Sequence, residues 1–513
     1  MNEKNKLNKG SLIPEVYNFL NTDNGVSLIV FGAAGTGKTT LALSMIEIYS
    51  DFIDAYYLST RVNDDSLLIH FPWLKNKAKE NAIAKPVFDN NKVRTMKLDI
   101  VKDKSVKNVT TSYLDKLYYK YTDEKQGVNS NNINIKRFQK ISEVYDIVNK
   151  NLPDSTLIVI DSVNGLADEY DVKPEEIIYA IQKDLVEGCS TKAIFVMENE
   201  DSNANYLADG IISLSLNYHE NRILRVAEIK KLRGMGVESP YYVFSLNNGK
   251  FKVPTDYSTE YIRLNKKNSN ANDNRILSTG FEEIDENLFE EKGLVPNLNY
   301  MVNFHYPLNN TDKNFLLSTF IKDACKKNVN VVSFSDKVIC GGGCNRFIPA
   351  NESKDGNDTS IHCIIKASED FESKILEPLM CKFNKVSVIK EAGNSDILSR
   401  KFMMSPFRNK NNRTVVLMDI DIMVDEFKLP IDKVISMMNE INMWENVTII
   451  AFCADIEDKK KAILDDMNYV IEIEQKYGTN IMYTSKPYSM IYAMSYAYIK
   501  DSKEKTVLLE PLK

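Results

Sequence analysis

Short apolar runs alternate with helix-length segments along the chain, and the whole alternation occurs twice. The first series has strand-like runs at 27–31, 55–59, 156–160 and 193–197, followed by strand-rich sequence from 211 to 251. Strands that alternate with helices form a mostly parallel sheet flanked by helices. We therefore predict an α/β domain over residues 1–253.

A second series of apolar runs lies at 300–303, 329–334, 414–418, 447–452 and 470–473. It predicts a second α/β domain over residues 275–513, built in the same order as the first. The stretch 254–274 between them contains KKNSNANDN and lacks apolar periodicity, so we expect a linker there. Polar insertions at 99–136 and 349–360 are expected to form surface loops or partly helical excursions.

Bulk composition narrows the class of protein. A chain of 513 residues is too long for one core, and 43% hydrophobic with 27% charged residues is typical of soluble globular proteins. The net charge of −6 disfavours a surface that follows a nucleic-acid backbone. Seven scattered cysteines form no disulfide framework, and no apolar run is long enough to span a bilayer. We expect a cytoplasmic protein with neither membrane nor nucleic acid as partner.

The segment SLIVFGAAGTGKTTLALSMI has the order strand, glycine-rich loop, helix, and contains the P-loop pattern G-x-x-x-x-G-K-T. Glycines let the backbone wrap so that its amides, and the following helix N-terminus, point at phosphate oxygens. Lys38 is expected to reach the β- and γ-phosphates, and the Thr39 hydroxyl to ligate magnesium. The predicted nucleotide-contacting residues of this loop are Gly32, Ala33, Ala34, Gly35, Thr36, Gly37, Lys38, Thr39 and Thr40.

A carboxylate for the magnesium ion is expected at the end of a buried strand. The run TLIVIDS supplies Asp161, which would hold the metal or one of its waters. No [NT]KxD pattern for reading guanine follows the P-loop. The sequence therefore predicts ATP with Mg²⁺ as the ligand, in preference to GTP.

Beyond these two motifs, the chain resembles the RecA/KaiC superfamily of P-loop ATPases. The segments KAIFVMENE, YLADGIISL and RVAEIKKLRG are similar to its sensor strand, "LADG" segment and K-x-R-G hairpin. The resemblance implies that Lys231 and Arg233 act at the γ-phosphate of a neighbouring subunit in a homo-oligomer, where cations stabilise charge that develops during phosphoryl transfer. The alternative for both residues is a solvated basic strand.

More narrowly, SLIPEVYNFL and YYLSTRVNDDSLLIHFPWL resemble the GvpD family of archaeal gas vesicle regulatory proteins and their P-loop relatives. The resemblance is specific over roughly the first 250 residues. It implies a repressor that needs its P-loop and acts through a protein partner, a transcription activator, without reading DNA itself.

One position departs from an active ATPase of the KaiC type. The family places a catalytic glutamate in a run similar to S-F-E-E, whereas this chain has Arg61 there. A guanidinium does not accept a proton from water at neutral pH, so hydrolysis is expected to be slow unless another group substitutes. By family position the nearest substitutes are Glu198 and Glu200. Arg61 itself would contact the γ-phosphate, dock a partner or form a surface ion pair.

The second half resembles the first, but the residues of its nucleotide-binding motif are altered. RILSTGFEEIDENL is similar to the KaiC-type opening R-x-x-T-G-x-x-x-L-D. RTVVLMDID resembles the strand that supplies a carboxylate for magnesium, here through Asp419 and Asp421. In NFHYPLNNTDKNFLL, Lys313 falls at the P-loop lysine position, but Pro307, Asp312 and Asn314 replace both glycines and the hydroxyl residue. We therefore expect a degenerate RecA-like domain that does not bind ATP.

One group of possible metal ligands remains. Cys340, Cys344, His362 and Cys363 could hold zinc, but their spacing matches no familiar zinc module, and a glycine-rich loop with incidental thiols is the alternative.

Three functions stay open: an ATP-binding regulator acting through a protein partner, a ring or filament ATPase with Lys231 and Arg233 acting between subunits, and a recombinase-like DNA-binding protein. The net charge disfavours the third, and Arg61 disfavours the second.

Overall fold

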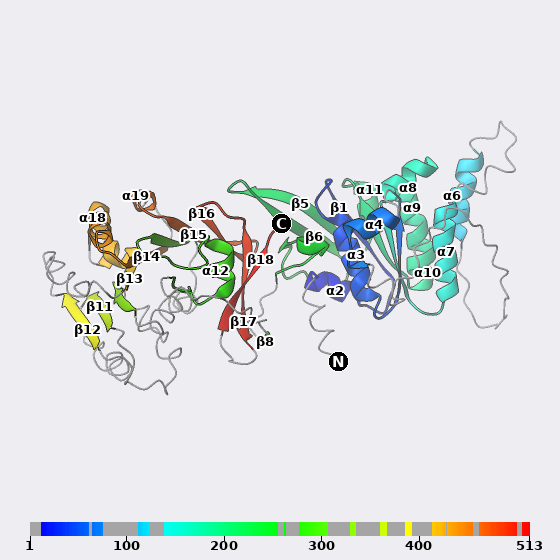
Figure 1. Ribbon diagram of the computed structural model, residues 1–513. Coiled ribbons are helices and arrows are strands. Elements are labelled where there is room, and N and C mark those ends of the chain that lie inside the picture. Colours follow the sequence, from blue (N-terminus) through cyan, green and yellow to red (C-terminus); the bar gives the residue numbers. More distant parts are fainter. Residues whose placement is uncertain are drawn as a thin grey trace. The chain divides into compact units, whose positions relative to one another are not determined.

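The structure is a computed structural model of the chain. It describes residues 12–60, 64–74, 111–123, 138–254, 261–262, 276–305, 316, 329–334, 360–366, 385–391, 413–426, 428–454, 461–499 and 505–513. The chain divides into two compact units (Figure 1). The first unit is Met1–Thr255 with Leu512–Lys513, and the second is Asp256–Pro511.

A seven-stranded sheet in the order β2-β3-β4-β1-β5-β6-β7 forms the centre of the first unit. The strands from β2 to β5 are parallel, and β6 and β7 continue the sheet antiparallel. Each apolar run that the sequence marked as a strand forms one. The strands are β1 (Val26–Gly32), β2 (Asp54–Ser59), β3 (Thr156–Asp161), β4 (Lys192–Met197), β5 (Gly210–His219), β6 (Arg222–Leu232) and β7 (Tyr241–Phe244).

Helices cover both faces of this sheet, which explains why its parallel strands are apolar along their whole length. Leu28 and Val30 of β1 pack in one core with α3, whereas Ile29 and Phe31 pack in the other with α7, α8 and α9. The helical segments are α2 (Pro14–Leu20), α3 (Lys38–Tyr49), α4 (Asp64–His70), α6 (Ser112–Asp123), α7 (Gln139–Asn151), α8 (Val163–Tyr170), α9 (Pro174–Ile181), η2 (Gln182–Val186), α10 (Glu187–Cys189), α11 (Ser202–Leu207) and the short turn η3 (Asn247–Gly249).

The polar insertion at 99–136 contains a helix, α6, that is anchored to the body of the unit. Asp184 of η2 is 1% exposed, and its carboxylate accepts the backbone N–H groups of Tyr113 at 3.2 Å and Leu114 at 3.0 Å. The Tyr145 hydroxyl donates to the same carboxylate at 3.0 Å. A buried carboxylate requires such donors, and the N-terminus of α6 supplies them together with its favourable dipole. The part of the insertion within 111–123 is therefore helical and held in place.

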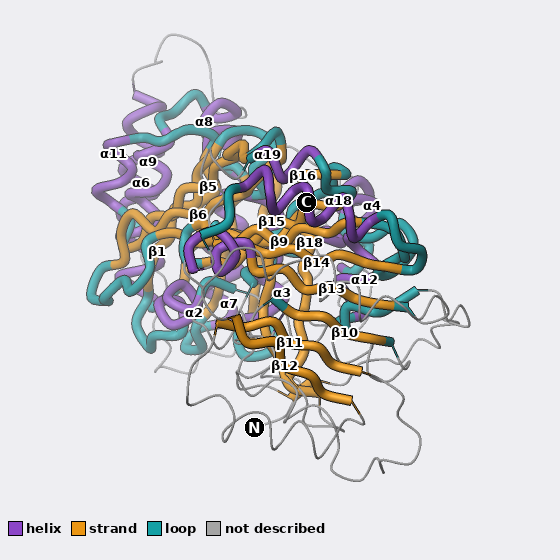
Figure 2. Tube along the Cα trace, turned by 90° about the vertical axis from the view of Figure 1, so that its left-hand side faces the viewer, coloured by secondary structure: helices purple, strands orange, loops and turns teal. Residues whose placement is uncertain are grey.

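The second unit repeats the strand order of the first. Its segment β10-β13-β14-β9-β15-β16-β17 corresponds strand by strand to β2-β3-β4-β1-β5-β6-β7, and Figure 2 shows the strands from β12 to β15 running side by side. Among the described residues this sheet has eleven strands. They are β8 (Tyr261–Ile262), β9 (Asn299–Phe304), β10 (Asn330–Ser333), β11 (Ser360–Lys366), β12 (Lys385–Glu391), β13 (Thr414–Asp419), β14 (Val447–Ala454), β15 (Tyr469–Lys476), β16 (Thr479–Lys486), β17 (Tyr492–Ile499) and β18 (Lys505–Pro511). The chain therefore has two α/β units whose central strands follow the same order.

Helices flank this second sheet as well. Val434, Met438 and Ile441 of α18 are buried against alternate residues of β13 and β14. On the other face, Ile284 and Leu288 of α12 lie in a core with residues of β9 and β15. The helical segments described here are α12 (Glu282–Leu288), η6 (Ile422–Glu426), α18 (Ile431–Asn442) and α19 (Ala462–Asp465).

Several strands were not predicted from the sequence. β8 lies within 254–274, the stretch expected to be a linker, and pairs with β17. β11 and β12 extend the sheet beyond β10, and β16, β17 and β18 continue it beyond β15. Among the described residues, no helix is both long enough and apolar enough to cross a membrane.

Two carboxylates of the second unit that resemble nucleotide-site residues cap local backbone. Asp419, at the end of β13, is 4% exposed and accepts the N–H of Ile422 at 3.2 Å. Asp285 accepts the N–H of Thr279 at 2.9 Å, in the segment that resembles the KaiC-type opening. Arg275 and the loop around Lys313, with Pro307, Asp312 and Asn314, lie outside the described residues.

A buried acidic group lies beside the end of β9, the strand that corresponds to β1. Glu472 of β15 bonds the ring of His305 at 2.7 Å and accepts from Asn303 at 2.8 Å and Ser485 at 2.6 Å. Burial alone would raise the pKa of Glu472, but hydrogen bonds from these three side chains outweigh it and hold the pKa below its usual value. An ionised carboxylate repels phosphate. That the second unit binds no nucleotide stays a prediction, because the loop that would hold phosphate lies outside the described residues.

Candidate phosphate-binding site

The loop between β1 and α3 has the backbone that a phosphate cradle requires. Gly35 and Gly37 have φ values of +79° and +102°, which side chains disfavour. A Cβ on Gly37 would also lie 2.8 Å from Leu246 Cδ1. Thr36 closes the loop by donating its hydroxyl to the Ala33 carbonyl at 2.8 Å. Left-handed glycines of this kind allow successive amides to converge on an anion.

Lys38 places a buried cation against this loop. It is 8% exposed, and its ammonium donates to the carbonyls of Gly32 at 2.6 Å and Ala33 at 3.0 Å. Its Nζ also lies 3.8 Å from Glu198 Oε2. An ammonium withdrawn from water needs such partners, and phosphate oxygens are stronger partners than neutral carbonyls. The loop therefore has its positive charge in the position from which it can contact a bound phosphate.

Thr39 and Asp161 meet at the first turn of α3. The Thr39 hydroxyl donates to Asp161 Oδ2 at 2.6 Å, so the two predicted magnesium residues, 122 positions apart, are in contact. A hydroxyl that donates its hydrogen keeps its lone pairs for a metal, and Asp161 has a second carboxylate oxygen. Both groups offer the oxygen ligands that magnesium prefers. The residues present therefore fit a magnesium ion.

Tyr57 was not predicted and belongs to the same cluster. Its hydroxyl donates to Asp161 Oδ2 at 2.8 Å. Burial, together with the neighbouring Asp161 carboxylate, raises the pKa of Tyr57 well above its usual value, so the hydroxyl stays a donor at physiological pH. Tyr57 lies on β2 opposite Val159 of β3, and only that pairing brings it to Asp161.

The end of β2 is fixed to the end of β3 by backbone and hydroxyl contacts. Thr60 N donates to the Asp161 carbonyl at 2.8 Å, and Ser162 N donates to Thr60 Oγ1 at 3.0 Å. Arg61, the next residue, lies outside the described residues, and its predicted role stays a prediction. Thr40 is 8% exposed on α3.

Glu198, at the carboxyl end of β4, is brought to the site. Its side chain is 25% exposed and faces Lys38, and its backbone N–H donates to Asn164 Oδ1 at 2.9 Å. Glu200, the other acidic residue considered, pairs with Lys230 at 2.9 Å. Lys230 also lies 4.9 Å from the ring centroid of Phe31, the residue before the loop. Lys230, which the sequence motifs did not indicate, is therefore the lysine of this hairpin that lies beside the start of the loop.

Lys231 and Arg233 lie away from the loop of their own chain. The strand pairing puts Lys231 beside Ile211, which pairs with Ile29, and Arg233 N donates to the Asp209 carbonyl at 2.8 Å. Asp209 in turn accepts Ser27 N at 3.2 Å, near the beginning of β1. Five residues of strand from there to Gly32 span roughly 16 Å.

Both cations have partners within the first unit. The Lys231 ammonium donates to the carbonyls of Asn205 at 3.1 Å and Ala208 at 2.6 Å, where it caps the C-terminal end of α11. Burial and the nearby Arg233 guanidinium lower the pKa of Lys231. Arg233 pairs with Asp209 at 2.8 Å and keeps a side chain that is 62% exposed. Within one chain neither cation belongs to the phosphate site.

The remaining candidates do not join the site. The Trp73 indole donates to the Gly249 carbonyl at 3.0 Å, so its polar edge has a partner outside the phosphate site. Cys340 and Cys344 lie outside the described residues, as do the side chains of His362 and Cys363. Among the described residues, no group of three His, Cys, Asp or Glu side chains could hold a metal ion.

Comparison with known proteins finds a similarity that covers most of the first unit. Residues 16–231 match the family model described as GvpD gas vesicle protein, P-loop domain. Among solved structures, the chain is similar to the KaiC-like protein PH0186 from the hyperthermophilic archaeon Pyrococcus horikoshii OT3, with 18% identity and a TM-score of 0.31 over 45% of this chain and 90% of that one. No curated protein matches the chain. Over residues 16–231, the first unit is therefore similar to the P-loop domain of the GvpD gas vesicle protein, which agrees with the glycine-rich loop and the Thr39–Asp161 contact described above.

Proposed function

We propose that this protein is a cytoplasmic, ATP-dependent regulatory switch that acts through a protein partner. The single observation that carries the proposal is the contact between Thr39 and Asp161 beside the buried ammonium of Lys38. This set of groups suits a nucleoside triphosphate whose phosphates and magnesium ion are held together. The name of the matched family suggests that the circuit concerns gas vesicles.

We expect slow hydrolysis, which would favour a switch over a motor. Magnesium, when bound, would neutralise charge on the phosphates, but a water molecule must still lose a proton to a base. Within the described residues, Glu198 is the carboxylate that lies against Lys38, and taking up a proton would cost it that ion pair. Bound ATP would then persist long enough to shift the protein between two arrangements.

Single-turnover hydrolysis tests this proposal. With purified full-length protein in excess over labelled ATP and Mg²⁺, we expect conversion well below the roughly 1 s⁻¹ that marks the lower end of typical enzyme turnover. Glu198→Gln should slow hydrolysis further. Glu187 is a carboxylate that pairs with Lys183 outside the site, so Glu187→Gln should leave the hydrolysis rate unchanged. Rapid hydrolysis that survives Glu198→Gln would contradict a slow switch.

The motor remains an alternative because Arg233 is exposed enough to reach a second chain. For a switch without a trans-acting finger, Arg233→Ala should leave steady-state hydrolysis within about twofold of the parent, measured at protein concentrations on both sides of any self-association. A loss of hydrolysis that appears only at concentrations where the protein assembles would favour the motor.

A further inference from the structure

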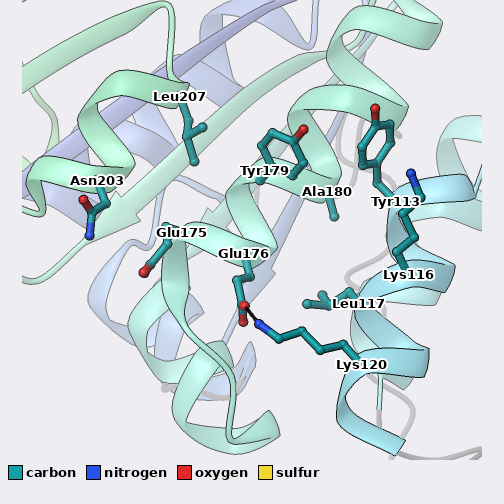
Figure 3. A pocket seen from close by; sticks show the side chains of 10 residues that line it. All are labelled: Tyr113, Lys116, Leu117, Lys120, Glu175, Glu176, Tyr179, Ala180, Asn203 and Leu207. Carbon is teal, nitrogen blue, oxygen red and sulfur yellow. Dashed lines mark hydrogen bonds and ion pairs between the residues drawn. The ribbon is translucent and has the colours of Figure 1, made fainter. Parts of the chain in front are cut away.

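Three helices of the first unit enclose a surface groove of about 590 Å³, drawn in Figure 3. We call this the helix groove. Its floor is apolar and comes from Leu117 of α6, Ala180 of α9 and Leu207 of α11. Its volume lies within the range of ordinary binding sites. α9 packs against both α6 and α11, so the groove is bounded by helices.

Aromatic side chains lie in and beside the helix groove. Tyr113 and Tyr179 meet edge to face across it, with ring centroids 5.4 Å apart. Tyr179 is 39% exposed, and Tyr206, on α11, is 81% exposed. Exposed tyrosines around an apolar floor are typical of protein interfaces, because one ring contributes contact area and a polar tip at low entropic cost.

Charged side chains of opposite sign lie on the two walls. Lys116 lines the groove on the α6 side, next to Tyr113, and Glu175 lines it from α9, on the side nearer Asn203 (Figure 3). Between them Lys120 pairs with Glu176 and links the walls. The Lys116 ammonium lies 4.4 Å from the ring centroid of Tyr113, a contact that leaves a full charge for a carboxylate. The groove is therefore basic on the α6 side and acidic on the α9 side.

We propose that the helix groove binds an amphipathic helix of the protein partner, a proposal that rests on the regulatory function proposed above. An apolar floor between helical walls suits the apolar ridge of a helix, whereas an added strand needs an open sheet edge. The charges on the walls indicate which residues of the bound helix flank its apolar ridge. Its ridge is flanked by acidic residues that face Lys116 and by basic residues that face Glu175.

α11 connects the helix groove with the phosphate site. Glu198, 3.8 Å from the Lys38 ammonium, lies only a few residues before α11 begins. The α11 side chain of Asn205 donates to Glu200 at 3.3 Å, so this helix is tied to the same end of β4. A nucleotide that draws Lys38 away from Glu198 acts on a segment continuous with the groove floor. Mg-ATP therefore changes the affinity of the groove for its helix.

The test uses three fluorescent peptides and the full-length protein. The first is a four-turn helix with leucines at i, i+3, i+4 and i+7, acidic residues along one flank and basic residues along the other. The second has the two flanks exchanged, and the third has a central proline that breaks the helix. Anisotropy titrations should show the first binding roughly tenfold tighter than the second, with the third weaker than both.

Charge reversal of the walls gives the decisive comparison. In the double variant Lys116→Glu with Glu175→Lys, the preference between the first two peptides should invert. The matched control, Lys140→Glu with Glu169→Lys, reverses a surface ion pair that does not line the groove and should leave the preference unchanged. No saturable binding below about 1 mM, an unchanged preference in the double variant, or equal binding of the proline peptide would each overturn the proposal.

ATP binding is measured in the same samples, so that the two proposals fail separately. If ATP binds but no peptide does, the groove proposal is wrong and the nucleotide site stands. If ATP does not bind, the regulatory function itself is wrong. Mg-ATP should change the affinity for the first peptide severalfold in the parent protein and not in Lys38→Ala, and an equal affinity with and without Mg-ATP would overturn the connection through α11.

Discussion

Replacing Lys38 with alanine is expected to weaken Mg-ATP binding by roughly 10- to 100-fold. The ammonium is buried against the loop, where it donates to two carbonyls at 2.6 and 3.0 Å. A hydrogen bond to a charged group contributes about 1.5–3 kcal/mol, more than a bond between neutral groups. A phosphate that has lost its water and its lysine partner is left with an unpaired charge. Isothermal titration calorimetry with a slowly hydrolysed ATP analogue would measure the change directly.

A matched lysine controls for the loss of charge. Lys183→Ala removes an exposed ion pair with Glu187 and should bind ATP as the parent does. Thermal unfolding without nucleotide checks that Lys38→Ala remains folded, since its removal frees the carbonyls of Gly32 and Ala33. An unchanged affinity for ATP in a folded Lys38→Ala protein would mean that this loop is not the phosphate site.

The P-loop was predictable because its geometry depends on residues close in sequence. The positive φ values of Gly35 and Gly37 follow from residue type and spacing, and the strand before and the helix after them are strongly apolar. Asp161 was predictable for a related reason, because it ends a continuous apolar run that only a buried strand explains.

The positions of Tyr57 and Lys231 were not predictable in the same way. Tyr57 reaches Asp161 through the pairing of β2 with β3, two strands separated by about a hundred residues. Lys231 is displaced from the loop by the pairing of β6 with β5, which includes an irregularity after Ile211. Register is set by packing over the whole sheet, and a shift of one residue moves a side chain to the other face.

In the second unit, the strands near the edges of the sheet were also not predictable from the sequence. Its central strands are continuous apolar runs and were found, whereas SIHCIIK and KVSVIKE in β11 and β12 mix polar with apolar residues. Mixed patterns of this kind are typical of strands near a sheet edge, and they resemble loop sequence when no neighbour is known. The central runs thus indicated β9, β10, β13, β14 and β15, and the extensions beyond β10 and β15 were not predicted.

Replacing Tyr57 with phenylalanine should lower the affinity of the ATP-bound site for magnesium by roughly 10-fold. Removing a group that orients a metal ligand typically lowers metal affinity by about 10- to 100-fold, and we expect the lower value here. The hydroxyl and the Thr39 side chain donate to the same oxygen, Asp161 Oδ2, and so hold the carboxylate in one orientation. Without the hydroxyl, Asp161 keeps its charge but loses one of these two constraints. ATP affinity measured in EDTA should be unchanged, because Tyr57 acts through Asp161 and not on the phosphates.

Tyr56 provides the matched control on the same strand. Its hydroxyl accepts from Asn151 at 2.9 Å and has no contact with Asp161, so Tyr56→Phe removes the same group from the same strand without touching the site. Titration of Mg²⁺ into each protein with bound ATP would compare the two variants. If both lose magnesium affinity equally, the loss reflects β2 as a whole and Tyr57 has no positioning role. A loss confined to Tyr57→Phe would instead mean that the magnesium site depends on β2 as well as on the two familiar motifs, since the hydroxyl that orients Asp161 belongs to neither.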